Sequence, residues 1–458
     1  MSCTFRTCRW ALYSTLHLAR LASWLKRSFL WVLLAIGSSW ALASPPPTLT
    51  DAKRLERVRA SLVDIEVELS RVVGQVTGAS GFVAGQPDWV ITNLHALDRV
   101  IFHSDDHRLR VRGAQGQRLS AHVLAIDVVN DLVLLHTDLP LAGTPLAVAA
   151  DLPAEGAPLW AMGNAGGDGF VVHRGTHAGL EADAISPSME FDGDIKPGMS
   201  GGPVLDVAGR VVAVNRARST ENQGLGYLVP GQAVLRLMEQ ARTSPYRLAE
   251  SMVQDMQRQY RAFSQAHVDR WTARALPPQR MGPFQVPVGF TEDACTANRY
   301  ERPTERFVVY RLNCQSMEFA PFLDDLDIAV IQMRHYWVTN PWHGDLKSAR
   351  AASFLMRYLR EEDAGEVREH NHWTCRYNRV KNAAGQNLDL QACRRPYLRL
   401  GGFHDYRLRA ALEVQGPDAL VTALDMAGID EANASRLTRH WLDQIRRPVE
   451  PGRKWGQP

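Results

Sequence analysis

The segment KPGMSGGP, residues 196–203, places Ser200 between glycines and leads into an apolar run. Glycines on both sides of a serine let the backbone turn tightly, expose the hydroxyl and direct amide groups toward a nearby point. An enzyme that attacks an acyl carbon needs this geometry, because the tetrahedral oxyanion must meet hydrogen-bond donors that are already in place. Alone, a glycine-flanked serine is weak support for such chemistry, since many loops contain one.

A base and an orienting carboxylate should accompany such a serine, because a hydroxyl is a poor nucleophile until a base takes its proton. Upstream of Ser200, the segment VITNLHA places His95 just past a strand-like run. Between the two, the segment NDLVLL places Asp131 at the entrance of an apolar run. The chain order is therefore His, Asp, Ser. Asp127 is the nearest rival to Asp131, but it precedes Val-Val-Asn, and we interpret it as a turn residue.

The surrounding sequence predicts a domain rich in β-strands. From about residue 70 to Pro230, short apolar runs are separated by Gly, Asp and Asn at brief intervals, which is typical of a sandwich or barrel of antiparallel strands. These runs are residues 81–84, 89–92, 132–135, 159–162 and 211–214. Helical patterns follow at about 232–241 and 247–275, and Pro277 with Pro278 marks a boundary after them.

Together, these segments resemble the chymotrypsin-like serine proteases and, within them, the bacterial HtrA-type branch. The matching blocks follow the family's order: GASGFV at 78–83 with ITNLH at 91–95, Asp127 with Asp131, MGN at 162–164, IKPGMSGGP at 195–203, VVAVN at 211–215 and GYLVP at 226–230. The resemblance covers residues 78–230, about a third of the chain. It implies an all-β double-barrel protease domain, which we place at 57–242, followed by a helical connector at 243–280.

The resemblance implies a role for each residue of the expected site. His95 is the general base and later the general acid, Asp131 holds its imidazole, and Ser200 attacks the substrate carbonyl. The backbone amides of Gly198 and Ser200 form the expected oxyanion hole. Asn215, in a closing strand, is expected to contact substrate. The implied substrates are proteins or peptides, and no metal or other cofactor is expected.

Two residues that precede Ser200 in the chain, Met199 and Asp194, bear on how the enzyme is activated and on which substrates it selects. Where digestive proteases carry an aspartate just before the serine, this chain has Met199, so activation by an ion pair with a new N-terminus is excluded. The resemblance implies instead that ligand or partner orders the loop. Asp194 stands six residues before Ser200, where digestive enzymes have the floor of their specificity pocket. A buried carboxylate there would favour Arg or Lys substrates; a solvated loop aspartate is the alternative.

The N-terminal segment is typical of an export signal. Basic residues precede an apolar run from Phe29 to Leu34, which leads to the small-x-small site Ala41-Leu42-Ala43. We expect a signal peptide at 1–43 and a linker at 44–56. An uncleaved anchor is the alternative, although residues 29–43 fall short of the roughly 20 apolar residues that a membrane span needs.

Residues 281–458 lack the features of the PDZ domains that HtrA-type proteins usually carry, and we expect a disulfide-stabilised α+β domain there. Cys3 and Cys8 leave with the signal. The four cysteines that remain are Cys295, Cys314, Cys375 and Cys393. In an oxidising compartment, two disulfides are favoured over a zinc site, because C-x-x-C pairs are absent.

The cysteine spacing indicates a tandem repeat of 281–362 and 363–448, with coincidence as the alternative. Corresponding cysteines are offset by 80 and 79 residues, and each pair is followed by a strand-like run and a helical pattern. These lie at 327–333 with about 347–360, and at 406–414 with about 431–446. The repeat predicts that Cys295 pairs with Cys314 and Cys375 with Cys393, one of three connectivities open to four cysteines.

Composition and charge restrict the class of protein. The chain has 458 residues, 45% apolar and 22% charged, which excludes a collagen, a wholly disordered chain and a polytopic membrane protein. Of the 52 basic residues, five lie within residues 1–43, which hold no acidic residue, so the remaining chain is close to neutral against its 49 acidic residues. This balance gives no general electrostatic reason to bind nucleic acid or anionic lipid.

We therefore expect an exported serine endopeptidase in the periplasm, with envelope protein quality control as a family-level expectation. A secreted or membrane-anchored location is the alternative, and no stable membrane span is expected after signal cleavage. HtrA-type relatives often trimerise, which leaves a homo-oligomer open. The rival hypothesis is a non-catalytic binding or signalling protein that keeps the protease fold as a scaffold and uses its C-terminal domain as the interaction module.

Overall fold

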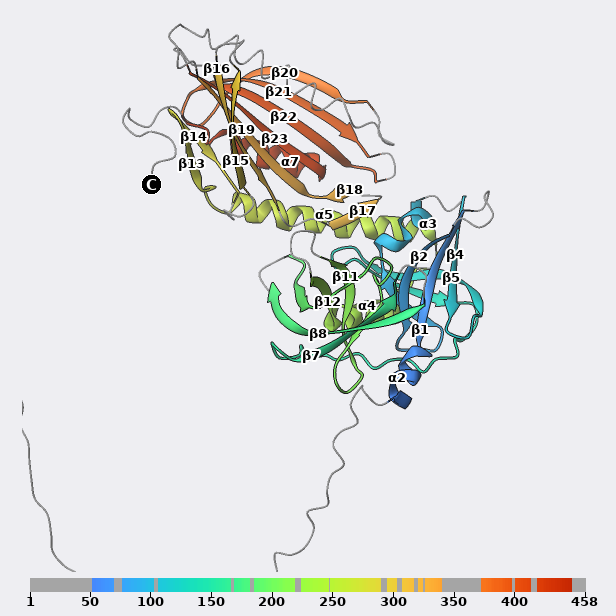
Figure 1. The fold of residues 1–458 in the computed structure, drawn as a ribbon. Coiled ribbons are helices and arrows are strands. Elements are labelled where there is room, and N and C mark those ends of the chain that lie inside the picture. The colour runs from blue at the N-terminus through green and yellow to red at the C-terminus, as the bar shows by residue number, and fades with distance from the viewer. Residues whose placement is uncertain are drawn as a thin grey trace, which may run out of the picture. The chain divides into compact units, whose positions relative to one another are not determined.

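The structure is a computed structural model, and the residues that it describes belong to one compact unit, Thr48–Pro458 (Figure 1). The described residues are 52–69, 76–102, 106–165, 169–181, 185–218, 224–246, 248–289, 295–302, 307–316, 320–323, 326–339, 372–397, 400–412 and 418–446. The predicted signal peptide at 1–43, the first part of the linker and the predicted helix at about 347–360 lie outside them. Among the described residues, no helix is both long and apolar enough to cross a membrane.

Six antiparallel strands close the first barrel in the order β1-β2-β3-β6-β5-β4, after a short helix α2 (Ala52–Arg59). They are β1 (Leu62–Leu69), β2 (Val76–Val83), β3 (Trp89–Asn93), β4 (His107–Gly113), β5 (Arg118–Asp127) and β6 (Leu132–Thr137). Every residue of β3 is buried, because Trp89 and Ile91 join one hydrophobic cluster while Val90 joins another. Burial on both faces explains why the sequence shows apolar runs here and little alternation.

Six further antiparallel strands close the second barrel in the order β10-β11-β12-β9-β8-β7. They are β7 (Pro158–Asn164), β8 (Phe170–Glu181), β9 (Ser188–Asp192), β10 (Pro203–Leu205), β11 (Val211–Arg218) and β12 (Leu225–Pro230). Buried side chains such as Leu159, Phe191 and Val204 form its core. The predicted double barrel is therefore confirmed.

Two helices follow the barrels, as the sequence predicts: α4 (Gly231–Thr243) and α5 (Ala249–Thr272). Helix α4 packs against β5, β6 and β11. The buried side chains of α5 recur mostly at intervals of three or four residues, which gives the helix one apolar face. They include Met252, Met256, Tyr260, Phe263, His267, Val268 and Trp271.

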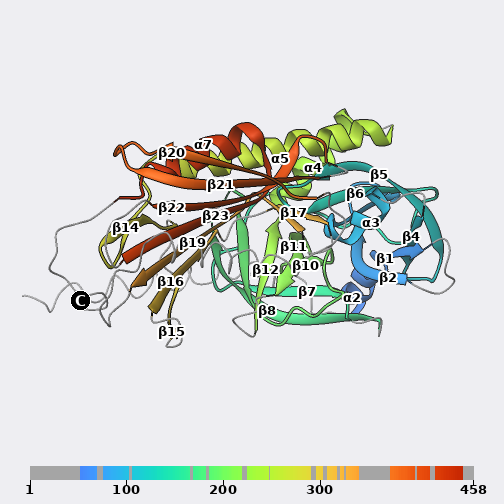
Figure 2. The same cartoon turned by 90° about the horizontal axis from the view of Figure 1, so that it is seen from above.

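Seven antiparallel strands form the C-terminal sheet, in the order β15-β16-β19-β23-β22-β21-β20. They are β15 (Cys295–Arg302), β16 (Phe307–Gln315), β19 (Val330–Thr339), β20 (Thr374–Lys381), β21 (Asn387–Pro396), β22 (Phe403–Leu412) and β23 (Asp418–Asp430). Two small hairpins accompany the sheet: β13 (Pro278–Met281) with β14 (Phe284–Pro287), and β17 (Ala320–Leu323) with β18 (Leu326–Ile328). Helix α7 (Glu431–Leu442) runs beside α5, and both pack against β23 (Figure 2).

The predicted disulfides are confirmed. Cys295–Cys314 joins β15 to β16, Cys375–Cys393 joins β20 to β21, and in each hairpin the two cysteines are register partners. The hairpins form the two edges of the sheet, so each half runs inward from a hairpin to one further strand. This symmetry agrees with the predicted repeat. Strand β23 lies between the halves and has no counterpart in the first half among the described residues, so the repeat stays a prediction.

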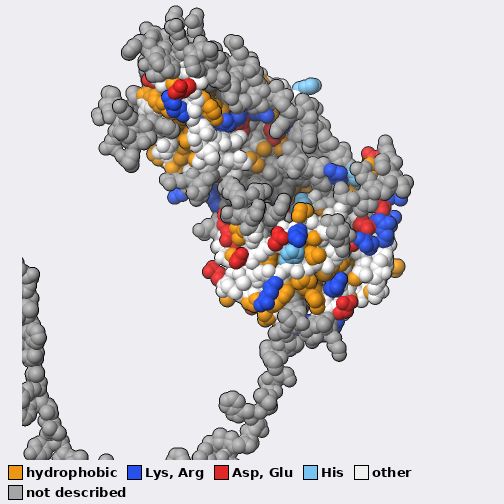
Figure 3. Space-filling view, viewed as in Figure 1, with side chains coloured by type: hydrophobic (Ala, Val, Ile, Leu, Met, Phe, Trp, Pro, Cys, Tyr) orange, Lys and Arg blue, Asp and Glu red, His pale blue; other side chains and the backbone are white. Residues whose placement is uncertain are grey.

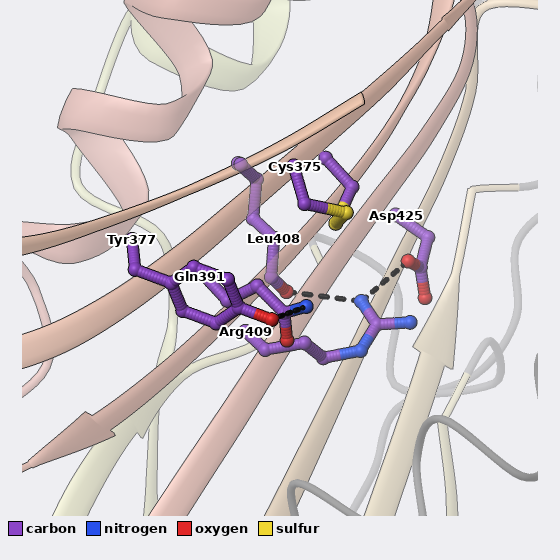
Figure 4. Close-up of a disulfide and its surroundings, with 7 residues drawn as sticks. Cys375, Tyr377, Gln391, Leu408, Arg409 and Asp425 are labelled. Atoms are coloured by element: carbon purple, nitrogen blue, oxygen red, sulfur yellow. Dashed lines mark hydrogen bonds and ion pairs between the residues drawn. A yellow bond between two sulfur atoms is a disulfide. The ribbon is translucent and has the colours of Figure 1, made fainter. Parts of the chain in front are cut away.

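A charged cluster links the two halves at the central strand. Asp425 of β23 accepts a hydrogen bond of 2.6 Å from Arg409 of β22 and forms an ion pair with Arg334 of β19. Figure 4 shows Arg409 between Asp425 and the carbonyl of Leu408, near the Cys375 disulfide. Arg409 and Arg334 are buried, and a buried charge is costly unless it is paired. Their shared partner Asp425 therefore favours the arrangement that keeps β19 and β22 on either side of β23.

Charged side chains do not gather by sign on the face shown in Figure 3. Lys and Arg side chains are interspersed with Asp and Glu side chains over the barrels, and apolar side chains lie between them. An interspersed surface gives no broad field of one sign. On this face, the described residues therefore agree with the near-neutral charge balance of the chain.

One histidine of the C-terminal sheet is fully buried. His335 of β19 lies with Nε2 2.7 Å from the carbonyl oxygen of Pro287 and Nδ1 2.6 Å from the hydroxyl of Thr422. A carbonyl only accepts, so Nε2 carries the proton and Nδ1 accepts from the hydroxyl. Burial disfavours the charged ring and lowers the pKa of His335 to about 4.

We expect the free energy of unfolding to fall as the pH drops from about 6.5 toward 4. In this range His335 binds a proton in the unfolded chain but stays neutral in the folded protein. The contribution should amount to about 2 kcal/mol between pH 7 and pH 5. Denaturant unfolding at both pH values should show a smaller loss for His335→Gln than for the wild type. His372→Gln, at an exposed position, is the control; equal losses in all three proteins would contradict the prediction.

Candidate active site

His95 and Asp131 form a close pair in the first barrel. His95 begins the short 3-10 helix η1 (His95–Leu97) that follows β3, and Asp131 lies in the turn between β5 and β6. The distance from His95 Nδ1 to Asp131 Oδ2 is 2.6 Å, and the His95 backbone amide donates to Asp131 Oδ1 at 2.9 Å. An ionised carboxylate only accepts, so Nδ1 carries the proton and Nε2 of the neutral ring is the basic nitrogen.

The backbone around Asp131 holds the carboxylate in place. Asp131 has a φ of +55°, a left-handed conformation that few residues other than glycine adopt, and its side chain is almost fully buried. Its carbonyl oxygen accepts from the Leu94 amide at 3.1 Å and from Asn93 Nδ2 at 2.8 Å. The segments before the histidine and around the aspartate are therefore tied together by backbone groups as well as by the side chains.

Asp127 has a different position. Its two carboxylate oxygens accept from the amide and from the side chain of Asn130, at 3.0 and 2.7 Å. These bonds close the turn that leads to Asp131. The geometry is that of the turn residue expected from the sequence.

Ser200 lies in the loop between β9 and β10, which docks on the first barrel. The Ser80 amide donates to the Ser200 carbonyl at 2.9 Å. A Cβ atom at Gly201 would collide with the carbonyl of Ser80 and the hydroxyl of Thr92, so only glycine lets the loop approach this closely. The loop thus reaches the strand that ends two residues before His95. The Ser200 hydroxyl donates to the Arg216 carbonyl at 3.2 Å, a bond it would leave to give its proton to a base.

The loop before Ser200 presents backbone amides in a defined arrangement. Gly198 has a φ of +91°, which glycine adopts without strain. The amides of Met199, Gly201 and Gly202 donate to Lys196, Asn215 and Met199 carbonyls, at 3.1, 2.9 and 3.0 Å. The amides of Gly198 and Ser200 are the candidates to stabilise an oxyanion.

Three residues that sequence reasoning assigned no role connect to this loop. Ser80 Oγ accepts from the Asn164 amide at 2.8 Å and donates to the Gly198 carbonyl at 2.7 Å. Asn164 Nδ2 donates to Asp64 Oδ1 at 2.8 Å, and Asp64 pairs with Arg112. We call Asp64, Asn164 and Ser80 the relay. It runs from Asp64 in β1 of the first barrel to Asn164 at the end of β7 in the second barrel, and then to Ser80 in β2 of the first barrel. Ser80 in turn bonds the carbonyl of Gly198 in the serine loop.

Burial makes the relay sensitive to the loss of any partner. Ser80 is fully buried and Asp64 nearly so. Burial raises the pKa of Asp64, while the bond from Asn164 and the charge of Arg112 oppose that rise. Ser80 and Asn164 lie in blocks that match the HtrA-type pattern, at 78–83 and 162–164, but nothing in the sequence indicated a role for either of them. Asp64 is one of three acidic residues that alternate with apolar ones in LVDIEVEL, so nothing singled it out.

The structure places Asn215 and Asp194, the two residues expected to bind substrate, in different surroundings. The Asn215 side chain is fully buried and donates to the Met162 and Met199 carbonyls, at 2.9 and 3.2 Å, so it supports the serine loop from behind. The Asp194 side chain is 56% exposed and lies 4.0 Å from His173 Nδ1. A pocket floor that selects Arg or Lys requires a buried carboxylate, and solvent reaches this one.

A metal site does not accompany these residues. Among the described residues, no group of three or more His, Cys, Asp and Glu side chains is placed to hold a metal ion. The arrangement offers a nucleophile, a base, a carboxylate that orients the base, and backbone donors, which are the parts that acyl transfer needs.

Comparison with known proteins gives a family for this part of the chain. Residues 79–214 match the family model of the trypsin-like peptidase domain. Protease Do-like 1, chloroplastic, of Arabidopsis thaliana is 31% identical over 175 residues, which are 35% of this chain and 38% of that protein. A probable periplasmic serine endoprotease DegP-like of Ectopseudomonas mendocina is 28% identical over 170 residues, 35% of this chain and 34% of its own. The chain thus spans well under half the length of these two relatives.

Among solved structures, the Rv3671c protease from M. tuberculosis in its active form is similar at 23% identity and a TM-score of 0.37. The alignment covers 45% of this chain and 90% of that one. The fold assignment here depends on the two closed barrels themselves. With the family match and the Do-like and DegP-like relatives, they show that residues 79–214 match a trypsin-like peptidase domain and are similar to HtrA-type serine proteases.

Proposed function

We propose that the protein is an exported serine endopeptidase that cleaves peptide bonds of protein substrates through Ser200, His95 and Asp131. The observation that carries the proposal is the double contact of Asp131 with His95, through the ring and through the backbone amide. This contact fixes the tautomer in which Nε2 is the basic nitrogen, the one that can accept a proton from a serine. The serine loop docks on the same barrel, next to β3.

In the proposed mechanism, the Ser200 hydroxyl leaves the Arg216 carbonyl, gives its proton to His95 Nε2 and attacks the substrate carbonyl carbon. The negative charge that develops on the carbonyl oxygen is stabilised by the amides of Gly198 and Ser200. His95 then gives its proton to the leaving amine, which departs and leaves an acyl-enzyme. Water, deprotonated by His95, attacks the acyl carbon, and Ser200 regains its proton as the acid product leaves.

The surrounding chain supplies the setting for this activity. We propose a protease domain at 57–242, a helical connector at 243–280 and a C-terminal domain at 281–458, after a cleaved signal at 1–43. The signal pattern and the periplasmic DegP-like relative support a periplasmic location. A role in envelope protein quality control rests on the HtrA-type resemblance alone. We propose that Asn215 shapes the serine loop through its two buried bonds and does not contact substrate. Assembly into a homo-oligomer is part of the same family-based proposal.

We expect a fluorophosphonate probe to label the wild-type protein and to leave Ser200→Ala unlabelled, because the probe reacts only with an activated serine hydroxyl. Ser244→Ala, which removes an exposed serine after α4, is the control and should be labelled like the wild type. The labelling should be repeated with unfolded protein present, in case substrate orders the loop. A folded wild type that remains unlabelled in both conditions would favour the non-catalytic scaffold.

We expect Ser80→Ala to lower kcat for peptide hydrolysis by about ten- to hundred-fold, with a much smaller change in KM. The substitution removes both bonds of the hydroxyl and leaves the Gly198 carbonyl without that buried donor, so the oxyanion loop loses its support. Steady-state kinetics measure the effect. Ser61→Ala is the control, because Ser61 is equally buried and bonds carbonyls away from the loop. If both variants lose stability but keep kcat, the relay is purely structural.

A further inference from the structure

The connector helix α5 contacts the turn that carries Asp131 through one side chain. Gln259 Nε2 donates to the Ile126 carbonyl at 2.8 Å, and Gln259 Oε1 accepts from the Val128 amide at 2.9 Å. These two backbone groups flank Asp127, the last residue of β5. The side-chain amide of Gln259 therefore makes the pair of bonds that a neighbouring strand would make with the chain just before the turn.

The turn between β5 and β6 needs contacts from outside itself, such as the two bonds of Gln259. Strand pairing between β5 and β6 ends with Asp127 and Leu132, so the residues between them lie outside the ladder. Within this turn, Asp131 has a positive φ. A non-glycine residue persists in this conformation when surrounding contacts impose it. Gln259 fixes the chain immediately before the residues that must adopt the turn.

A polar network fixes the orientation of Gln259. Its Nε2 also donates to Asp255 Oδ2 at 2.9 Å, and the same carboxylate accepts from the hydroxyl of Tyr246 and from Gln240 of α4. The Tyr246 amide in turn donates to the Leu124 carbonyl of β5 at 2.9 Å. Burial and the neighbouring carboxylate raise the pKa of Tyr246, so its hydroxyl remains a donor at neutral pH.

The same helix belongs to the core of the C-terminal sheet. Tyr260, the neighbour of Gln259, packs edge-on against Phe403 of β22 with ring centroids 6.5 Å apart. One continuous hydrophobic cluster includes these two rings together with Leu94 and Leu97, which flank His95. Strand β17 of the C-terminal domain also lies near η1, the short helix that begins at His95. The connector helix thus contacts the turn that carries Asp131, and the C-terminal domain contacts the segment that carries His95.

We propose that Gln259 is a positioning residue, through which α5 and the C-terminal half hold Asp131 in the geometry that orients His95. The proposal rests on the proposed function of Ser200, His95 and Asp131. It gives the C-terminal half a part in the chemistry: the barrels supply the triad, and α5 completes the support of its carboxylate. Ordinary packing between the two halves is the competing explanation, and it predicts an effect on stability alone.

We expect Gln259→Met, which keeps the size of the side chain and removes both backbone bonds, to lower kcat/KM by about ten-fold or more at neutral pH. The pKa of His95, followed by NMR of histidine-labelled full-length protein, should fall by about half a unit or more, because a displaced carboxylate stabilises the imidazolium less. Gln254→Met is the matched control on the same helix, where Gln254 bonds Glu250 of α5. The control should match the wild type in both measurements.

The outcomes separate this proposal from the proposed function. If wild-type Ser200 reacts with the probe but Gln259→Met matches Gln254→Met in kcat/KM and in the pKa of His95, the positioning role is wrong. If the probe fails on the wild type while Gln259→Met still shifts the pKa of His95, the endopeptidase proposal fails and the positioning of Asp131 stands. Should Gln259→Met not fold, Gln259→Glu, which retains an acceptor for the Val128 amide, is compared with Gln254→Glu by the same criteria.

Discussion

The contact between the buried carboxylate of Asp131 and the ring and amide of His95 is the interaction on which the site depends. Because the carboxylate is buried, it needs hydrogen-bond donors in place of water, and the positive φ of Asp131 needs contacts that impose it. The turn itself supplies neither the donors nor these contacts. The carboxylate accepts from the ring and the amide of His95, at the start of η1. The backbone carbonyl of Asp131 accepts from Asn93 of β3, and Gln259 of α5 bonds the chain just before the turn.

The second barrel meets this pair through a loop built from glycine and from backbone bonds. Gly201 and Gly202 lie so close to carbonyls of neighbouring strands that any side chain would be excluded, which fixes the path of the chain on either side of Ser200. The relay and Asn215 then hold carbonyls of the loop, and thereby direct its amides. Ser200 lies beside the strands of one barrel and His95 in the other, and buried polar groups hold the serine loop against the first barrel.

Local patterns in the sequence predicted a domain of antiparallel strands, the helices after it and the cysteine pairing, because strands, helices and adjacent hairpins each leave a short-range signal. The double barrel followed from the resemblance to the chymotrypsin-like proteases. They also singled out His95, Asp131 and Ser200 through flanking residues. They could not reveal Ser80, Asn164 or Gln259, whose bonds join positions 118, 84 and 131 residues apart. The substrate-binding roles expected of Asp194 and Asn215 stay predictions. Asp194 has the exposure of the solvated loop aspartate that was its alternative reading, and the Asn215 side chain is buried behind the serine loop.

The two disulfides join cysteines that are consecutive in the chain, and each closes a hairpin of its own. A polypeptide that emerges N-terminus first presents Cys314 to Cys295 before either later cysteine has appeared. Once Cys3 and Cys8 have left with the proposed signal peptide, the first disulfide forms without a competing thiol, and the second forms when Cys295 and Cys314 are already paired. Vectorial emergence alone selects one pairing out of the three that four cysteines allow, without reshuffling by a thiol catalyst.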